Sequence, residues 1–146
     1  MVKRAVSLIG FMALCVLFAS PGAVSGQDVG VTFDRILNAE NEPENWLTYS
    51  GGYDSQRHTT LDQIDSDNVA DLELKWVYQA ESLDVFQTSP LVVDGIMYLT
   101  EAPNTVVALD AKLGRVFWRY EYTPSNLSRP CCGRVNRGLG MLGHTL

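Results

Sequence analysis

The chain has 146 residues and a formal net charge of −6 at neutral pH. Binding to nucleic acid needs a basic surface that neutralises phosphates, so the acidic composition argues against a nucleic-acid partner. The same charge fits a soluble exported protein and indicates nothing more specific.

The first 26 residues have the pattern of a signal peptide. Basic residues at positions 3–4 are followed by an apolar stretch over residues 5–19. Small residues at 24–26 then precede an expected cut at Gln27. We therefore expect a periplasmic protein that keeps no stable membrane span after cleavage.

Two other interpretations of this segment stay open. A membrane anchor would need about 20 apolar residues, whereas Pro21 and Gly22 interrupt the stretch before that length is reached. A lipid anchor on Cys15 fits poorly, because Leu14 precedes the cysteine and more of the apolar stretch follows it.

Residues 27–72 form a polar, loop-rich segment with a short helix expected near each end. The first helix is expected near Thr32–Asn38. The second follows Asp65, a typical N-cap residue, and continues to Asp71. Between them, the glycines at 51–52 indicate a turn.

Residues 73–146 change to a β pattern, beginning with the alternating segment Leu74–Tyr78. The pair Asp94-Gly95 lies between two apolar runs and predicts a hairpin, because both residues tolerate positive φ. A second turn is expected over residues 110–114. The four short antiparallel strands of one propeller blade are expected at residues 90–93, 96–100, 105–109 and 115–120.

The last residues repeat the start of this pattern. An apolar run at 140–142, the turn Gly143-His144 and residues 145–146 resemble the hairpin around Asp94, whose turn begins 49 residues earlier. Blade repeats have a period of about 40–50 residues. One blade cannot bury both of its faces alone, so we expect an all-β propeller of which this chain is the N-terminal part.

Two adjacent cysteines, Cys131 and Cys132, are the most distinctive feature of the sequence. If Cys15 is removed with the signal peptide, they are the only thiols left in the chain. One possibility is that each stays free or bonds to a cysteine elsewhere, although this chain offers no such partner. The other is a bond between sequence neighbours, which is strained and rare. Exposed thiols are a liability in an oxidising compartment, which favours the bond.

Several motifs carry a family resemblance. The run from Ala108 to Trp118 contains Asp110 and Gly114 and is similar to the tryptophan-docking repeat of quinoprotein propellers, with Leu113 where that repeat usually has threonine. The adjacent cysteines and the Val-Asn-Arg-Gly that ends at Gly138 resemble the cysteine-pair motif of the methanol/ethanol-type dehydrogenases that use pyrroloquinoline quinone (PQQ). Similarity to the N-terminal region of that family extends over residues 46–52, 61–64 and 90–95.

The resemblance implies an eight-bladed propeller with PQQ on its axis and a calcium ion beside the quinone. It implies that Cys131 and Cys132 form a disulfide lying flat on one face of PQQ, and that Arg137 donates hydrogen bonds to the quinone. Such an enzyme oxidises a primary alcohol to an aldehyde and passes electrons to an acceptor such as a cytochrome c. The calcium ligands and catalytic aspartate are expected beyond Leu146, so the chain alone is expected to be inactive.

Gln87 lies three residues before Pro90, where this family commonly has a glutamate that contacts the cofactor. Glutamine still donates and accepts hydrogen bonds but brings no charge. An ordinary polar role remains open for Gln87, and a surface salt bridge remains open for Arg137.

Two further interpretations compete with an enzyme. One is a non-enzymatic propeller scaffold of the envelope, of the outer-membrane assembly type, and the other is the remnant of a dead gene. The cysteine pair and Arg137 argue against the scaffold, which has no use for a strained disulfide beside a central arginine.

Overall fold

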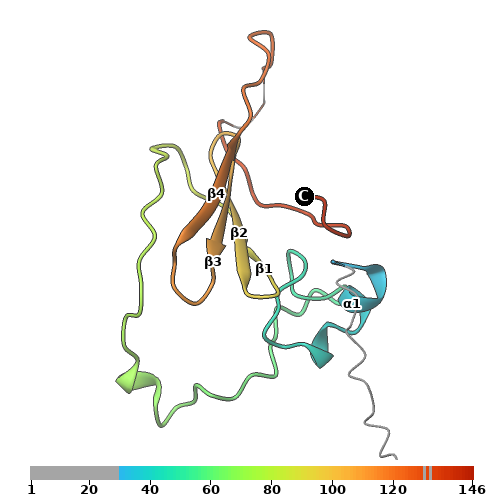
Figure 1. The fold of residues 1–146 in the computed structure, drawn as a ribbon, viewed down its shortest axis with the longest axis vertical. Coiled ribbons are helices and arrows are strands. Elements are labelled where there is room, and N and C mark those ends of the chain that lie inside the picture. Colours follow the sequence, from blue (N-terminus) through green and yellow to red (C-terminus); the bar gives the residue numbers. More distant parts are fainter. Residues whose placement is uncertain (1–29, 130, 132) are drawn as a thin grey trace, which may run out of the picture.

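The computed structural model describes residues 30–129, 131 and 133–146, so the predicted signal peptide lies outside the described residues. Within them, a four-stranded antiparallel sheet has the strand order β1-β2-β3-β4, and short helices precede it (Figure 1). The bounds are α1 Phe33–Leu37, η1 Ala39–Asn41, η2 Val69–Asp71, β1 Leu91–Val93, β2 Ile96–Glu101, β3 Thr105–Asp110 and β4 Val116–Glu121. The expected four strands are therefore confirmed. Across this part of the chain, no helix has the length and apolar character needed to cross a membrane.

The hairpin between β1 and β2 turns at the predicted pair of residues. Val93 pairs with Ile96, so Asp94 and Gly95 alone make the turn. Their φ angles are +51° and +82°. Positive φ at both positions is what a two-residue type I′ turn requires, so the local sequence sets the register of the whole hairpin.

The turn between β3 and β4 is held by the side chain of Asp110. Its carboxylate accepts hydrogen bonds from the backbone nitrogens of Lys112 and Leu113, at 2.9 and 3.0 Å. Gly114 then adopts a φ of +68°, which reverses the chain into β4. The turn predicted over residues 110–114 is thereby confirmed.

One face of the sheet packs against the two ends of the described chain. Leu91 and Val93 of β1 are buried together with Val31 and Leu47 from the N-terminal segment. The partly buried side chains around them are Ile36, Tyr98, Leu139 and Met141. Residues far apart in sequence thus share one apolar cluster.

The opposite face of the sheet is covered by the segment that precedes it. Leu99, Val107 and Leu109 form a second buried cluster, against which Tyr78 and Met97 pack. In the same segment as Tyr78, the ring of Trp76 lies against Gly114, so close that a Cβ on the glycine would be 2.5 Å from the ring.

The β pattern over Leu74–Tyr78 does not produce a strand in the structure. The side chains of Trp76 and Tyr78 contact the β3–β4 turn and one face of the sheet, and within the described residues their backbone pairs with no strand. The side chains of Leu74 and Val77 are largely exposed. An alternating pattern therefore reports one buried side of an extended segment and does not by itself specify a pairing partner.

The predicted second hairpin is present at the end of the chain. Leu142 pairs with Thr145 around the two-residue turn, where Gly143 has a φ of +58°. Gly143 also exchanges two backbone hydrogen bonds with Val31, at 2.8 and 2.7 Å. The C-terminal residues consequently lie next to the segment that leads into α1 (Figure 1).

Of the two expected helices, the first forms as an α-helix and the second only as a short 3-10 turn. Helix α1 forms where predicted, and Thr32 caps it by accepting a hydrogen bond from the backbone nitrogen of Arg35 at 3.2 Å. Asp65 also caps its own segment, accepting from the nitrogen of Asn68 at 3.0 Å, but only the 3-10 turn η2 follows. This segment buries no side chain, and so short a helix is marginal without packing.

The contact between Trp76 and Gly114 can be tested with a matched pair of substitutions. Gly114→Ala and Gly95→Ala both place a Cβ at positive φ, which costs roughly 1 kcal/mol. Only at Gly114 does the new Cβ also overlap a ring, whereas open space surrounds Gly95. We expect Gly114→Ala to lower the free energy of unfolding by about 2–4 kcal/mol.

The measurement is urea unfolding followed by tryptophan fluorescence. Gly95→Ala is the control and should cost about 1 kcal/mol. Equal losses for the two variants would show that Trp76 does not pack on the turn in solution.

Candidate functional site

Two segments that the sequence singled out lie side by side in the structure. Ser89 and Gly138 form a parallel bridge, and the nitrogen of Ser89 donates to the carbonyl oxygen of Arg137 at 3.0 Å. Gln87 lies two residues before Ser89 in the extended stretch leading to β1. The backbone therefore brings the Gln87 and Arg137 segments to the same edge of the fold.

This approach depends on a glycine. Gly138 has a φ of +135°, and a Cβ there would lie 2.9 Å from the carbonyl oxygen of Ser89. Asn136 supports the bend, because its Oδ1 accepts a hydrogen bond from the nitrogen of Gly138 at 3.1 Å. The motif Asn-Arg-Gly thus encodes a local turn that presents the arginine side chain.

The side chains of Gln87 and Arg137 are both exposed. Neither forms a side-chain hydrogen bond or ion pair with the residues that the structure describes. A guanidinium and an amide left available on adjoining segments suit a ligand rich in carboxylate and carbonyl oxygens, such as PQQ. Their contact with a cofactor remains a prediction.

The cysteine pair is only partly described. Cys131 is exposed, whereas Cys132 lies outside the described residues. The Cys131–Cys132 disulfide therefore stays a prediction. An ion pair, Nε of Arg134 to Asp84 at 3.4 Å, joins the loop that follows the cysteines to the stretch that precedes Gln87.

Near this stretch lies a buried charged cluster that the sequence did not reveal. Glu101, 1% exposed, ends β2 and pairs with Arg119 of β4, Nη2 to Oε2 at 2.7 Å. Tyr78 donates its hydroxyl hydrogen to Glu101, and Arg119 donates to the Tyr78 oxygen at 2.8 Å. A carboxylate at the end of a mostly apolar strand was the sequence signal for the cluster.

The cluster shifts the titration of its members. Burial, followed by the hydrogen bond to the Glu101 carboxylate, raises the pKa of Tyr78 to about 12. Burial alone would raise the pKa of Glu101, but the hydrogen bonds from Arg119 and Tyr78 hold it below its ordinary value. The ionised carboxylate therefore stabilises the fold at neutral pH, and this contribution is lost as the pH falls through the lowered pKa of Glu101.

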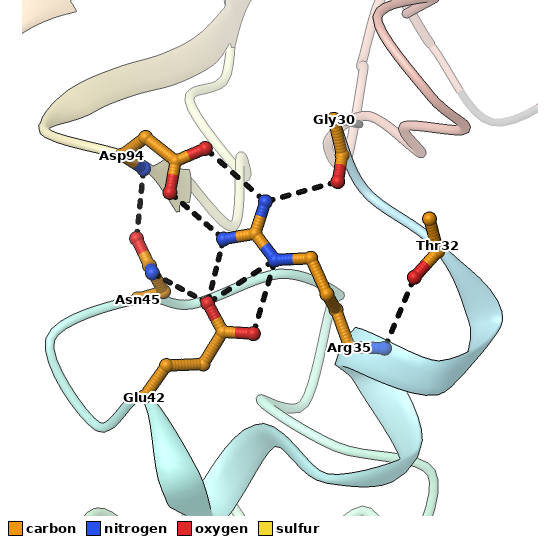
Figure 2. Close-up of polar contacts among 6 residues, drawn as sticks. All are labelled: Gly30, Thr32, Arg35, Glu42, Asn45 and Asp94. Atoms are coloured by element: carbon orange, nitrogen blue, oxygen red, sulfur yellow. Dashed lines mark hydrogen bonds and ion pairs between the residues drawn. The ribbon is translucent and has the colours of Figure 1, made fainter. Parts of the chain in front are cut away.

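A second polar cluster fixes the N-terminal segment to the sheet (Figure 2). The guanidinium of Arg35 pairs with Glu42 at 2.6 Å and with Asp94 at 2.8 Å, and Nη1 donates to the carbonyl oxygen of Gly30 at 2.9 Å. Asn45 bridges the two acids, donating to Glu42 and accepting from the nitrogen of Asp94. Hydrogen bonds to Arg35 lower the pKa of both carboxylates.

Next to this cluster the chain extends the sheet. Trp46 exchanges two backbone hydrogen bonds with Val92 of β1, at 2.7 and 3.0 Å.

Within the described part of the chain, no group of three or more ligating side chains could hold a metal ion.

Comparison with known proteins places the chain in a family. Residues 46–144 match the family model of the PQQ glucose/ethanol/alcohol dehydrogenase β-propeller domain. The dehydrogenase subunit of the quinone alcohol dehydrogenase of Acetobacter aceti is 40% identical over 143 residues, covering 92% of this chain and 19% of that protein. The quinohemoprotein alcohol dehydrogenase ADH-IIG of Pseudomonas putida is 36% identical over 135 residues, covering 89% and 19%.

Solved structures agree with these relatives. The quinohemoprotein alcohol dehydrogenase ADHIIG of Pseudomonas putida HK5 superimposes with a TM-score of 0.71 at 37% identity, covering 80% of this chain and 17% of that one. A europium-containing methanol dehydrogenase gives 0.66 at 34% identity, covering 75% and 20%. The chain thus spans about a fifth of the length of the relatives it matches. With its antiparallel sheet and these matches, the chain belongs to the PQQ-dependent alcohol dehydrogenase family and forms part of its β-propeller domain.

Proposed function

We propose that this chain is the N-terminal part of a periplasmic PQQ-dependent dehydrogenase that oxidises a primary alcohol to an aldehyde. The relatives are named as alcohol dehydrogenases, which supports the reaction class. The observation that carries the proposal is the Ser89–Gly138 bridge, because it sets the Gln87 and Arg137 segments together in a chain of this family. Electrons would pass to an external acceptor such as a cytochrome c.

In this proposal the chain contributes one side of the cofactor site. Arg137 binds oxygens of PQQ with its planar fork of donors, and Gln87 adds a neutral hydrogen bond. The disulfide of Cys131 and Cys132 covers one face of the ring. When bound, PQQ supplies the oxidant for the alcohol, while these residues hold and orient it.

The remaining chemical groups are proposed to lie outside this chain. By resemblance to the family, the ligands of a calcium ion beside the quinone and a catalytic aspartate come from residues beyond Leu146. Residues 1–146 alone should therefore not oxidise alcohols. Tests of cofactor binding use the full-length protein of which this chain is the proposed N-terminal part, called the complete propeller below.

The role of Arg137 can be tested in the complete propeller. Arg137→Ala removes charge-assisted hydrogen bonds to PQQ, each of which contributes about 1.5–3 kcal/mol. We expect PQQ to bind roughly ten- to a hundred-fold more weakly in a titration of apo-protein at fixed calcium. Arg137→Lys should recover only part of this affinity, because an ammonium cannot reproduce the guanidinium fork.

Two controls frame this titration. Arg129→Ala changes another exposed arginine of the same loop, which donates to the nearby carbonyls of Asn126 and Ser128, and it should leave affinity unchanged. Gln87→Ala should cost less than Arg137→Ala, because a neutral amide makes the weaker bond. Unchanged PQQ affinity in Arg137→Ala would exclude Arg137 from the site.

The cysteine pairing has its own test. In the exported protein we expect Cys131 and Cys132 to be bonded to each other, since an oxidising compartment disfavours exposed thiols. Tryptic mapping without reduction should recover both in one peptide, about two mass units lighter than the reduced form, because bond formation removes two hydrogens. Alkylation of both thiols in native, unreduced protein would contradict the pairing.

Export can be tested on the N-terminus. The basic start, the short apolar stretch and the small residues at 24–26 predict that the mature protein begins near Gln27. Mass spectrometry of a periplasmic extract should find this N-terminus. Soluble protein that still begins at Met1 would contradict the proposal.

A further inference from the structure

Residues 82–88, called the arch below, carry Gln87 and are fixed mainly at their two ends. At one end, Ser82 donates its hydroxyl hydrogen to the carbonyl oxygen of Ala102 at 2.6 Å. At the other, the hydroxyl oxygen of Thr88 accepts from the nitrogen and the hydroxyl of Thr100, both at 3.0 Å. The arch therefore spans between neighbouring positions at the end of β2.

Little else holds the middle of the arch. The side chain of Leu83 is fully exposed, and those of Val85 and Phe86 are about half exposed. Among the described residues, its polar contacts are a hydrogen bond within the arch, from the nitrogen of Asp84 to Ser82, and the exposed ion pair of Asp84 with Arg134. Exposed ion pairs contribute little stability. The position of Gln87 is thus set by the two anchors and by the Ser89–Gly138 bridge just beyond the arch.

The first anchor is built on the buried Glu101. Besides Arg119 and Tyr78, its Oε1 accepts from the backbone nitrogen of Glu81 at 3.4 Å, one residue before the arch begins. The next residue of the chain after Glu101 is Ala102, whose carbonyl receives Ser82. Glu101 therefore holds the chain at Tyr78 and at Glu81, just before the arch leaves the sheet.

We propose that Glu101 is a positioning residue of the cofactor site, which fixes the start of the arch so that Gln87 is presented toward the Arg137 segment. The inference rests on the proposed function for the identity of the ligand. The direct consequence concerns the arch alone. Weakening the anchor should let residues 82–88 open locally without unfolding the sheet.

The experiment uses the complete propeller and the substitution Glu101→Gln, which keeps the shape of the side chain but removes its charge. Hydrogen exchange of the apo-protein should show the amide of Asp84, which donates to the Ser82 hydroxyl oxygen, exchanging about tenfold faster, the factor expected for one lost charge-assisted hydrogen bond. PQQ affinity should fall several-fold. Glu121→Gln, an exposed carboxylate on β4, is the matched control and should change neither quantity.

A second variant guards against a folding defect in Glu101→Gln. Ser82→Ala removes the hydroxyl that donates to Ala102 and accepts from the nitrogen of Asp84, and it leaves the buried charges intact. It should raise exchange of the Glu81 amide, which donates to Glu101, and Arg119→Lys, which keeps the charge beside Glu101, should show a smaller effect on the Asp84 amide than Glu101→Gln. Unchanged exchange of the Asp84 amide in Glu101→Gln and of the Glu81 amide in Ser82→Ala would overturn the proposal.

The two proposals fail in different ways. If the unsubstituted complete propeller binds no PQQ, the proposed function is wrong, while exchange in the apo-protein still decides whether Glu101 holds the arch. If PQQ binds but is insensitive to both variants although the arch opens, Glu101 anchors the chain without positioning the site, and the proposal is wrong.

Discussion

Both faces of the four-stranded sheet are apolar, and each must be covered by chain from outside the sheet. Leu91 and Val93 are buried on one face by the N-terminal segment, and Leu99 and Val107 are buried on the other beneath Tyr78. Burial of apolar area is the dominant favourable term in folding. The long loops before β1 are therefore structural parts of the blade, since they provide the layers that the sheet lacks.

Each covering segment is fixed by one arginine that bridges it to the sheet. Arg35 joins α1 to the β1–β2 turn, and Arg119 joins β4 to the segment around Tyr78 (Figure 2 shows the first). An arginine suits this role because its planar fork can engage two acceptors at once and stays charged at any physiological pH. Apolar burial brings the segments to the faces, and these pairs select one position on each face.

The sequence was sufficient to predict structural features that depend only on residues close together in the chain. The turn at Asp94-Gly95 and the cap at Thr32 follow from local backbone preferences, and both form as predicted. The segment Leu74–Tyr78 shows the limit of local prediction. Its alternating pattern indicates that one side is buried but does not identify which residues pack against that side. The polar contacts of the fold join residues far apart in the sequence. Glu101 contacts Tyr78, 23 positions away, and Arg35 contacts Asp94, 59 positions away. Partners so distant are set by the tertiary fold, which composition and periodicity do not encode.

In the candidate site, one residue is required both by the local backbone conformation and by a contact with a distant segment. Gly138 is required locally, because its φ of +135° is hardly accessible to other residues. It is also required by a distant contact, because any Cβ would press on the carbonyl oxygen of Ser89. A turn could tolerate an alternative residue with some strain, and a close approach alone could be relieved by a small shift. Both demands together leave only glycine, so the short motif ending in Arg137-Gly138 is informative because it encodes the turn and the docking of that turn beside Gln87 at once.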